Sequence, residues 1–299
     1  MAVATSLGRP ATAMGLLLPG PYTAANGNTY SVQHNAAKCR VSAGGKERRW
    51  VQIDAWVVGG TSGIGAQVVE RLRARGLQPL ALSNDEKAGG HLRDRGLEFA
   101  YLDLGLSGEA VVERTETLLR QYDPPTYLFM SAGLTRQQAA VETSVAEWEL
   151  LANVNLLGVV HVCNAVARSW RLTPADPWIR HCVIVGSVNA FRPLSSQGAY
   201  SVMKAGLHAY AKCLSNDLAE DQIRVNVIAP GAIWTPMNEA LWLDDRDSIA
   251  KQKVLKSSLL GRWGEPQEIA DVAVWLALDS PTFVSGTELV VDGGHLAQR

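Results

Sequence analysis

Apolar residues follow two different spacings along the chain from Trp50 to its end. Short, almost continuous apolar runs are typical of buried strands, whereas apolar residues three and four positions apart are typical of amphipathic helices. The first pattern predicts strands at residues 51–58, 77–82, 97–102, 127–130, 181–185, 224–228 and 288–291. The second pattern predicts helices at residues 64–75, 107–122, 145–170, 199–219 and 266–277. This order predicts an α/β fold, with one parallel sheet covered by helices on both faces.

The first 49 residues show no such periodicity and are rich in Ala, Gly, Ser, Thr and Asn. Residues 1–50 hold six basic residues and one acidic residue, a net charge of +5, whereas the other 249 residues hold 22 basic and 28 acidic residues, a net of −6. We expect residues 1–49 to form a poorly ordered N-terminal extension outside a single domain of residues 50–299. An acid-poor, Ser-rich start is also typical of organelle transit peptides, and organelle targeting stays an alternative.

The overall composition excludes several classes of protein. With 299 residues, 47% of them hydrophobic, the chain is long enough for one large folded domain and unlike a disordered or collagen-like chain. Its formal net charge of −1 argues against a nucleic-acid or membrane-surface partner, and no apolar run approaches the roughly 18 residues of a membrane helix. The four cysteines are widely spaced, so we expect no metal site, no disulfide framework and a cytoplasmic location.

A glycine-rich turn separates the first predicted strand from the first predicted helix. It reads Gly59-Gly60-Thr61-Ser62-Gly63-Ile64-Gly65. Glycines let the backbone turn tightly and approach a phosphate closely, and the helix that follows offers free N–H groups and a positive dipole end. The turn therefore predicts a dinucleotide site, although a plain strand-to-helix turn would show the same residues.

A second candidate for chemistry is the pair Tyr200 and Lys204 in the predicted helix 199–219. Residues four apart share one face of a helix, so the phenol and the ammonium can be neighbours. A nearby positive charge favours the phenolate, and we expect Lys204 to lower the pKa of Tyr200 toward neutrality. A phenol with that pKa can donate and accept protons near pH 7.

These features, together with others in order along the chain, resemble the short-chain dehydrogenase/reductase family over residues 51–299. The matching positions are Gly59, Gly63, Gly65, Asp103, Ser131-Ala132-Gly133, Asn155, Ser187, Tyr200, Lys204, Pro230-Gly231, Thr235, Val284-Ser285-Gly286 and Val291-Asp292-Gly293-Gly294. The resemblance implies a single Rossmann-like doubly wound sheet, a catalytic tetrad of Asn155, Ser187, Tyr200 and Lys204, and a homotetramer. Two departures, Val58 and Met130-Ser131, stand where the family usually has Thr and Asn-Asn, and we expect them to loosen the hydrogen bonds of the turn.

The family resemblance also implies a reaction and a cofactor site. Tyr200 would exchange a proton with a carbonyl oxygen while hydride moves to or from a nicotinamide, so the chain would be a ketoreductase or alcohol dehydrogenase. Ser187 would bind the same oxygen, Lys204 the nicotinamide ribose, and Asn155 a water that links Lys204 to solvent. The implied cofactor contacts are Gly59, Thr61, Ser62, Gly63, Ile64, Gly65, Ser83, Asn84, Asp103, Leu104, Ser131, Ala132, Gly133, Tyr200, Lys204, Pro230, Gly231, Ile233 and Thr235.

Cofactor choice depends on the end of the second predicted strand, where an acidic residue would bind the ribose 2′-hydroxyl of NAD and repel the phosphate of NADP. Ser83 and Asn84 stand there instead, followed by Asp85. Positions 62 and 84 hold Ser and Asn, so the arginine that would bind the phosphate of NADP is missing as well. We therefore favour NADP(H), and NAD(H) stays possible because Asp85 could turn toward the ribose.

The substrate is less well defined by the sequence. Candidate substrate contacts are Leu134, Asn189, Phe191, Trp234, Met237 and Trp242. The segment 132–136 is similar to 3-oxoacyl-carrier-protein reductases, and a small-molecule carbonyl or alcohol is the expected partner. An epimerase or dehydratase of the extended relatives is disfavoured by the glycine spacing. A non-catalytic nucleotide-binding scaffold is disfavoured by the complete tetrad.

Overall fold

The computed structural model describes residues 52–238 and 258–298, together with the backbone of four short strands before them. The chain divides into two units, Met1–Gln52 and Ile53–Arg299. In the first unit, β1 (Tyr22–Thr23) pairs antiparallel with β2 (Thr29–Tyr30), and β3 (Arg40–Ala43) pairs antiparallel with β4 (Lys46–Arg49). The sequence analysis predicted none of these strands, and the rest of the expected extension lies outside the described residues.

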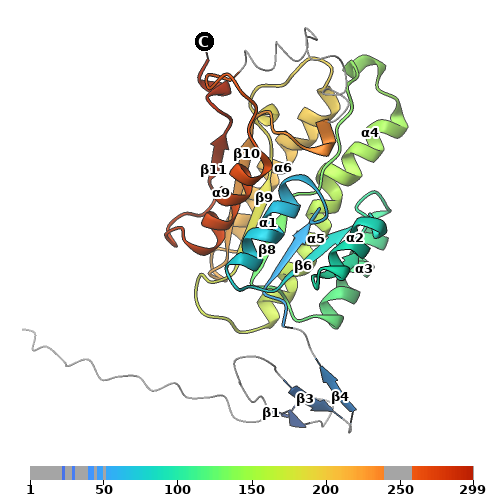
Figure 1. Cartoon of the computed structure of the whole chain (residues 1–299), viewed down its shortest axis with the longest axis vertical. Coiled ribbons are helices and arrows are strands. Elements are labelled where there is room, and N and C mark those ends of the chain that lie inside the picture. The colour runs from blue at the N-terminus through green and yellow to red at the C-terminus, as the bar shows by residue number, and fades with distance from the viewer. Residues whose placement is uncertain are drawn as a thin grey trace, which may run out of the picture. The chain divides into compact units, whose positions relative to one another are not determined.

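The second unit is built on a sheet of seven parallel strands (Figure 1). They are β5 (Ala55–Val58), β6 (Pro79–Ser83), β7 (Glu98–Tyr101), β8 (Tyr127–Met130), β9 (His181–Val185), β10 (Arg224–Pro230) and β11 (Glu288–Val291). Their order in the sheet is β11-β10-β9-β8-β5-β6-β7, so the chain moves outward from β5 to β7 and then crosses to β8 on the other side of β5. The predicted doubly wound α/β fold is confirmed.

Helices cover both faces of this sheet, since all four residues of β5 are buried although neighbouring residues of a strand point to opposite faces. Trp56 and Val58 belong to a core shared with α3 (Gly108–Gln121), α5 (Gly158–Leu172) and α6 (Gly198–Asp217). Ala55 and Val57 point to the opposite core, which is shared with α1 (Gly63–Ala74), α2 (Glu86–Asp94) and α9 (Pro266–Leu278). Strands buried on both faces explain why the strand sequences are almost continuously apolar.

Two helical features differ from the sequence prediction. The helix α2 was not predicted because Gly89 and Gly90 weaken its helical pattern. A Cβ at Gly89 would lie 2.3 Å from the ring of Phe99, so tertiary packing against β7 demands glycine there. The predicted continuous helix 145–170 is instead α4 (Val145–Ala152), a π-helical turn at Asn153–Leu157, and α5.

The combined helical stretch Val145–Leu172 is long and apolar enough to cross a membrane by length and composition alone, with a mean hydropathy of 1.7 over 18 residues. The expectation that no apolar stretch approaches this length is therefore wrong. Half of that window is buried inside the protein, where α5 packs against the sheet and α3. Core helices of large α/β domains have this composition because they are apolar on more than one side.

The crossover between β5 and β8 determines where a ligand can bind. In open parallel sheets the loops that follow neighbouring strands diverge at such a switch point and leave a crevice at the carboxyl ends of the strands. The glycine turn follows β5, and Ser131-Ala132-Gly133 follows β8. Both sequence signals therefore meet at this point of the sheet.

Candidate active site

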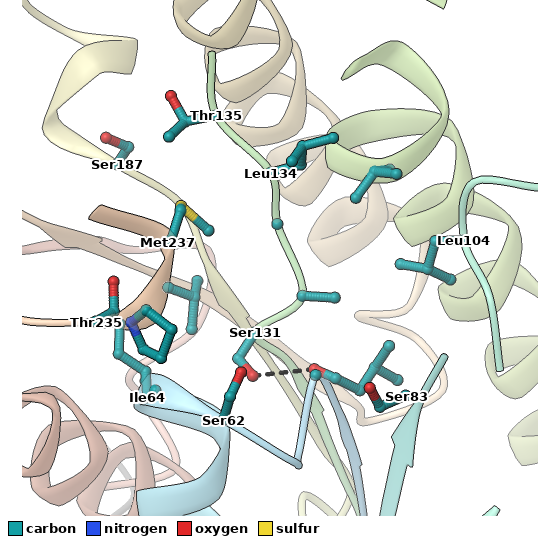
Figure 2. Close-up of a pocket in the computed structure, with 18 of the residues that line it drawn as sticks. Ser62, Ile64, Ser83, Leu104, Ser131, Leu134, Thr135, Ser187, Thr235 and Met237 are labelled. Carbon is teal, nitrogen blue, oxygen red and sulfur yellow. Dashed lines mark hydrogen bonds between the residues drawn. The ribbon is translucent and has the colours of Figure 1, made fainter. Parts of the chain in front are cut away.

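A cavity of about 710 Å³ lies at the carboxyl ends of the central strands. Figure 2 shows Ser83 and Leu104 toward one end of it and Ser187 and Thr135 toward the other. Nearly all of the predicted cofactor contacts line this cavity, namely Gly59, Thr61, Ser62, Gly63, Ile64, Ser83, Asn84, Asp103, Leu104, Ser131, Ala132, Gly133, Tyr200, Lys204, Pro230, Gly231, Ile233 and Thr235. Gly65 lies beneath the lining, in the first turn of α1. The fold thus gathers residues from the whole sequence at one site.

The glycine turn has a backbone shape that other residues would not adopt. Gly59 has a φ of +84°, and a Cβ there would lie 2.6 Å from the backbone nitrogen of Ala132. A Cβ at Gly65 would lie 2.2 Å from the carbonyl oxygen of Gly59. These glycines let the turn after β5 pack directly on the backbone of the segment after β8.

Ser131, directly after β8, holds the glycine turn in place through hydrogen bonds to the end of β5. Its backbone N–H and its hydroxyl both donate to the carbonyl oxygen of Val58, at 2.9 and 3.0 Å (Figure 2). The backbone N–H of Gly59 donates to the carbonyl oxygen of Leu82 at 2.7 Å. At the Met130-Ser131 departure the Ser131 hydroxyl supplies a hydrogen bond to the turn, whereas the loosening expected from Val58 stays a prediction.

The start of α1 is suited to bind an anionic group. Ser62 is the N-cap residue, its side chain makes no capping hydrogen bond, and the first turn of α1 holds no acidic residue. The free N–H groups and the positive end of the helix dipole favour a phosphate at this position. An extended cavity with a glycine turn and a helix N-terminus at its middle fits the pyrophosphate of a dinucleotide, so these residues can hold NAD(P).

At the end of β6, hydroxyl groups stand where an acidic residue would select NAD. The Thr61 hydroxyl donates to Ser83 Oγ at 2.9 Å, and the Asp85 backbone N–H donates to the same oxygen at 3.2 Å. The Asp85 carboxylate caps α2 by accepting a hydrogen bond from the N–H of Ala88 at 2.9 Å. Among the lining residues that the structure describes, Asp103 carries the only carboxylate, and its Oδ1 accepts from the N–H of Gly105 at 2.9 Å.

Ser187, Tyr200 and Lys204 come together at the other end of the cavity. Ser187 follows β9, whereas Tyr200 and Lys204 lie in the first two turns of α6. Lys204 is 3% exposed, its ammonium donates to the carbonyl oxygen of Val185 at 2.9 Å, and it lies 5.7 Å from the centroid of the Tyr200 ring. A phenol, a hydroxyl and an ammonium in this arrangement can transfer a proton to an oxygen atom and stabilise the charge on it.

Burial shifts both titrating groups toward their neutral forms. It raises the pKa of the Tyr200 phenol from 10.0 to about 12, and the hydrogen bond with Ser187 opposes this rise. It also lowers the pKa of Lys204 from 10.5 to about 8. The expectation that Lys204 brings the Tyr200 pKa close to neutrality is therefore wrong for the groups of this chain alone. Desolvation outweighs the charge, because the Lys204 ammonium lies beside the ring and is bonded to Val185.

Asn155, the fourth predicted catalytic residue, lies behind the cavity in the π-helical turn and is fully buried. Its Oδ1 accepts from the N–H of Leu134 at 2.9 Å, and its Nδ2 donates to the carbonyl oxygens of Leu134 and Leu151 at 2.8 and 3.1 Å. The side chain therefore pins the segment after β8 to the long helix. This tie explains why the helix widens into a π turn at this place.

The predicted substrate contacts are divided between several places. Leu134 and Met237 line the cavity. Asn189 is buried and donates through Nδ2 to Gln197 at 2.6 Å, whereas Phe191 is 44% exposed and lies outside this cavity. Trp234 also lies outside the lining and packs on Trp263, with 5.2 Å between ring centroids. Trp242 lies outside the described residues.

Several lining residues were not assigned a role from the sequence. They are Val58, Leu82, Leu102, Gly105, Leu106, Leu150, Val154, Val185, Gly186, Pro236 and Asn238. Val58, Leu82, Leu102 and Val185 end predicted strands and Gly186 directly follows one, which is a signal that could have found these five. Thr135, in the segment 132–136, also lines the cavity, and Figure 2 shows it toward the Ser187 end. Its hydroxyl oxygen is buried and makes no hydrogen bond to the described part of the chain.

Comparison with known proteins agrees with this geometry. A protein-family model described as Enoyl-(Acyl carrier protein) reductase matches residues 58–295. The 3-oxoacyl-[acyl-carrier-protein] reductase of Chlamydia trachomatis is 32% identical over 251 residues, which are 82% of this chain and 97% of that protein. The 3beta-hydroxysteroid dehydrogenase 1 of Eggerthella lenta is 29% identical over 245 residues, 80% of this chain and 91% of that protein. A solved 4-hydroxyisoleucine dehydrogenase complexed with NADH is 24% identical, covers 83% of this chain and all of its own with a TM-score of 0.74, and shares the fold.

Proposed function

The chain belongs to the short-chain dehydrogenase/reductase family and is an NAD(P)-dependent oxidoreductase that interconverts ketones and secondary alcohols, and on this premise we propose the roles of its site residues. Tyr200 donates its phenolic proton to the carbonyl oxygen during reduction and takes a proton back during oxidation. Ser187 donates a hydrogen bond to the same oxygen and stabilises the negative charge that develops on it. The bound nicotinamide supplies or accepts the hydride.

In our proposal, Lys204 and Asn155 support Tyr200 and Ser187 without bonding to the carbonyl oxygen themselves. Lys204 binds the ribose hydroxyls on the nicotinamide side and places a positive charge beside the Tyr200 ring. Asn155 holds the Leu134 segment in place and, with the remaining lone pair of Oδ1, anchors a water that links Lys204 to solvent. The N-terminus of α1 and the glycine turn bind the pyrophosphate.

One observation carries the proposal most directly. The Tyr200 phenol opens into the cavity, shares a hydrogen bond with Ser187, and has a pKa raised to about 12 by burial. Tyr200 is therefore fully protonated at pH 7, which is the state that a proton donor needs.

The direct test compares Tyr200→Phe with the wild type. The substitution keeps the ring and removes the hydroxyl, so we expect turnover to fall by at least about 100-fold while the melting temperature and cofactor binding stay unchanged. The matched control is Tyr210→Phe on the same helix, whose hydroxyl donates to Asn164 Oδ1 at 2.9 Å, away from the cavity. Steady-state rates with NADPH and NADH against ketones and 3-oxoacyl thioesters provide the measurement. Near-wild-type turnover of Tyr200→Phe on a good substrate would exclude Tyr200 as the proton donor.

We propose NADP(H) as the preferred cofactor. The hydroxyls of Thr61 and Ser83 and the amide of Asn84 can donate to a 2′-phosphate, and the one carboxylate among the described lining residues, that of Asp103, follows β7 and not β6. The Asp85 carboxylate, which could have favoured NAD, is engaged in capping α2. A cavity without a negative charge at this position tolerates the phosphate.

For the substrate, we propose a 3-oxoacyl thioester as the first class to test. The Chlamydia trachomatis relative is named for that substrate, and the segment 132–136 is similar to such reductases. Leu134 and Met237 add apolar surface at the reacting end of the cavity. A steroid is the second candidate, because the Eggerthella lenta relative acts on one.

We propose a cytoplasmic homotetramer in which residues 1–49 lie outside the catalytic fold. Exposed apolar side chains on the long helices support assembly: Val145 is 74% exposed, Leu157 43%, Leu172 83% and Val202 55%. Large apolar side chains that stay exposed on a subunit are covered when it packs against another copy, and this supports the proposal. The location rests on the cysteines, which are free thiols at all described positions.

A further inference from the structure

The four-residue spacing that joins Tyr200 to Lys204 continues for two more turns of α6, to His208 and Lys212. His208 does not line the cavity, yet it is almost completely buried, with 4% of its side chain exposed. A buried histidine one turn beyond a catalytic lysine requires partners for both of its ring nitrogens.

Those partners connect His208 to Ser187. Its Nε2 accepts a hydrogen bond from the backbone N–H of Ser187 at 3.2 Å. Its Nδ1 lies 3.0 Å from Oε1 of Glu288 on β11, and Oε2 of Glu288 pairs with the ammonium of Lys212 at 2.8 Å. Because a backbone N–H can only donate, Nε2 must be unprotonated, so Nδ1 carries the proton and donates it to Glu288.

The packing around this ring leaves it little freedom. A Cβ at Gly186 would lie 2.0 Å from Nε2 of His208, and the ring of Phe191 packs edge-on at 5.1 Å between centroids. On the other side of Gly186, Lys204 holds the carbonyl oxygen of Val185. Two side chains of α6 therefore fix the peptide groups on both sides of Gly186, directly before the Ser187 hydroxyl.

We propose that His208, oriented by Glu288, is a positioning residue that holds the Ser187 hydroxyl in line with Tyr200. This inference rests on the proposed function, because it acts through the proposed role of Ser187. The charged groups that face the imidazole are Glu288, Lys204 and Lys212. A second proton on His208 would place two donors face to face at Ser187, and burial, which lowers the pKa of His208, opposes that protonation.

A double-mutant cycle separates positioning from general stability. His208→Leu removes both hydrogen bonds, and we expect kcat to fall about tenfold, with the KM for the cofactor unchanged, because the Ser187 hydroxyl loses its fixed place. His208→Gln puts an amide oxygen near the position of Nε2, and we expect kcat within about threefold of the wild type. In a Ser187→Ala background, His208→Leu should lower kcat by less than about twofold, since nothing remains to be positioned. His161→Leu on α5 is the matched control.

Several outcomes would overturn the inference: no loss of kcat in His208→Leu, an equal further loss in the Ser187→Ala background, or no rescue by His208→Gln. A readout that needs no turnover is 15N NMR of labelled histidine, with the His208 signal identified by its absence in His208→Gln. We expect a neutral ring at pH 7 with its proton on Nδ1, and a proton on Nε2 would contradict the inference. If Ser187→Ala itself keeps full activity, the proposed role of Ser187 fails, while the NMR result still decides the hydrogen-bond pattern.

Discussion

Replacing Lys204 by methionine tests whether burial destabilises the charged form of its ammonium. Lys204 is 3% exposed and donates to one carbonyl oxygen, and burial lowers its pKa from 10.5 to about 8. Methionine keeps the length of the side chain and removes the charge. We expect turnover to be lost in Lys204→Met, because the cofactor ribose loses its proposed partner and Tyr200 loses its nearby charge.

The lowered pKa also predicts how stability changes with pH. Between pH 8 and 10.5 the unfolded chain keeps the lysine proton while the folded protein releases it, so wild-type stability rises as the pH rises through this range. The full effect of a pKa change from 10.5 to about 8 corresponds to about 3.4 kcal/mol. About 2.5 kcal/mol of it is gained between pH 7 and pH 10. Lys204→Met has no such group, and its stability lacks this rise.

The assay is urea unfolding of both proteins at pH 7, 8, 9 and 10, at equal protein concentration. The free energy of unfolding of the wild type should rise relative to that of Lys204→Met by about 2.5 kcal/mol across this range. The control is Lys212→Met on the same helix. Lys212 is 55% exposed, so we expect the difference in unfolding free energy between this variant and the wild type to change by less than about 0.5 kcal/mol over this pH range. A difference between wild type and Lys204→Met that does not vary with pH would refute the reasoning from burial.

Three further predictions follow from the site and the chain's organisation. Ser83→Asp should lower kcat/KM for NADPH by at least about tenfold and raise it for NADH, because a carboxylate would repel the 2′-phosphate, whereas Asp85→Asn should leave the ratio unchanged. Light scattering at micromolar concentration should give four times the chain mass of 32.2 kDa, and a monomer mass would contradict the proposed assembly. A chain that starts at Arg49 should keep its melting temperature and activity, and loss of folded protein would show that the first unit supports the second.

The sequence predicted the sheet well because its signal is local. The strands Tyr127–Met130 and His181–Val185 were placed at their observed ends, since buried parallel strands are apolar runs bounded by polar or glycine residues. The helix α2 was missed because its glycines are chosen by contact with Phe99 on β7. The π turn was missed for a similar reason, as Asn155 is tied to Leu134, 21 residues away along the chain. Features set by tertiary contacts leave no periodic signal.

In the candidate site, too, local motifs could be predicted from the sequence and features set by tertiary contacts could not. The glycine turn and the Tyr200–Lys204 pair are short motifs, and the fold brings both to one cavity. The direction of the Tyr200 pKa could not be obtained from spacing alone, because a spacing of four residues gives proximity but not burial. The partner of His208 was equally hidden, since Glu288 is 80 residues further along the chain.

The raised pKa of Tyr200 has opposite consequences for the two directions of the reaction. During reduction the phenol acts in its protonated form, which is the dominant form at pH 7. During oxidation it must first lose that proton, and with a pKa of about 12 this costs about 7 kcal/mol at pH 7. Lys204 keeps its charge at pH 7, below its pKa of about 8, but its ammonium lies beside the ring, and desolvation outweighs this charge. Burial thus keeps Tyr200 in the protonated form that reduction uses, and among the groups of this chain alone the Ser187 hydrogen bond is what opposes that effect.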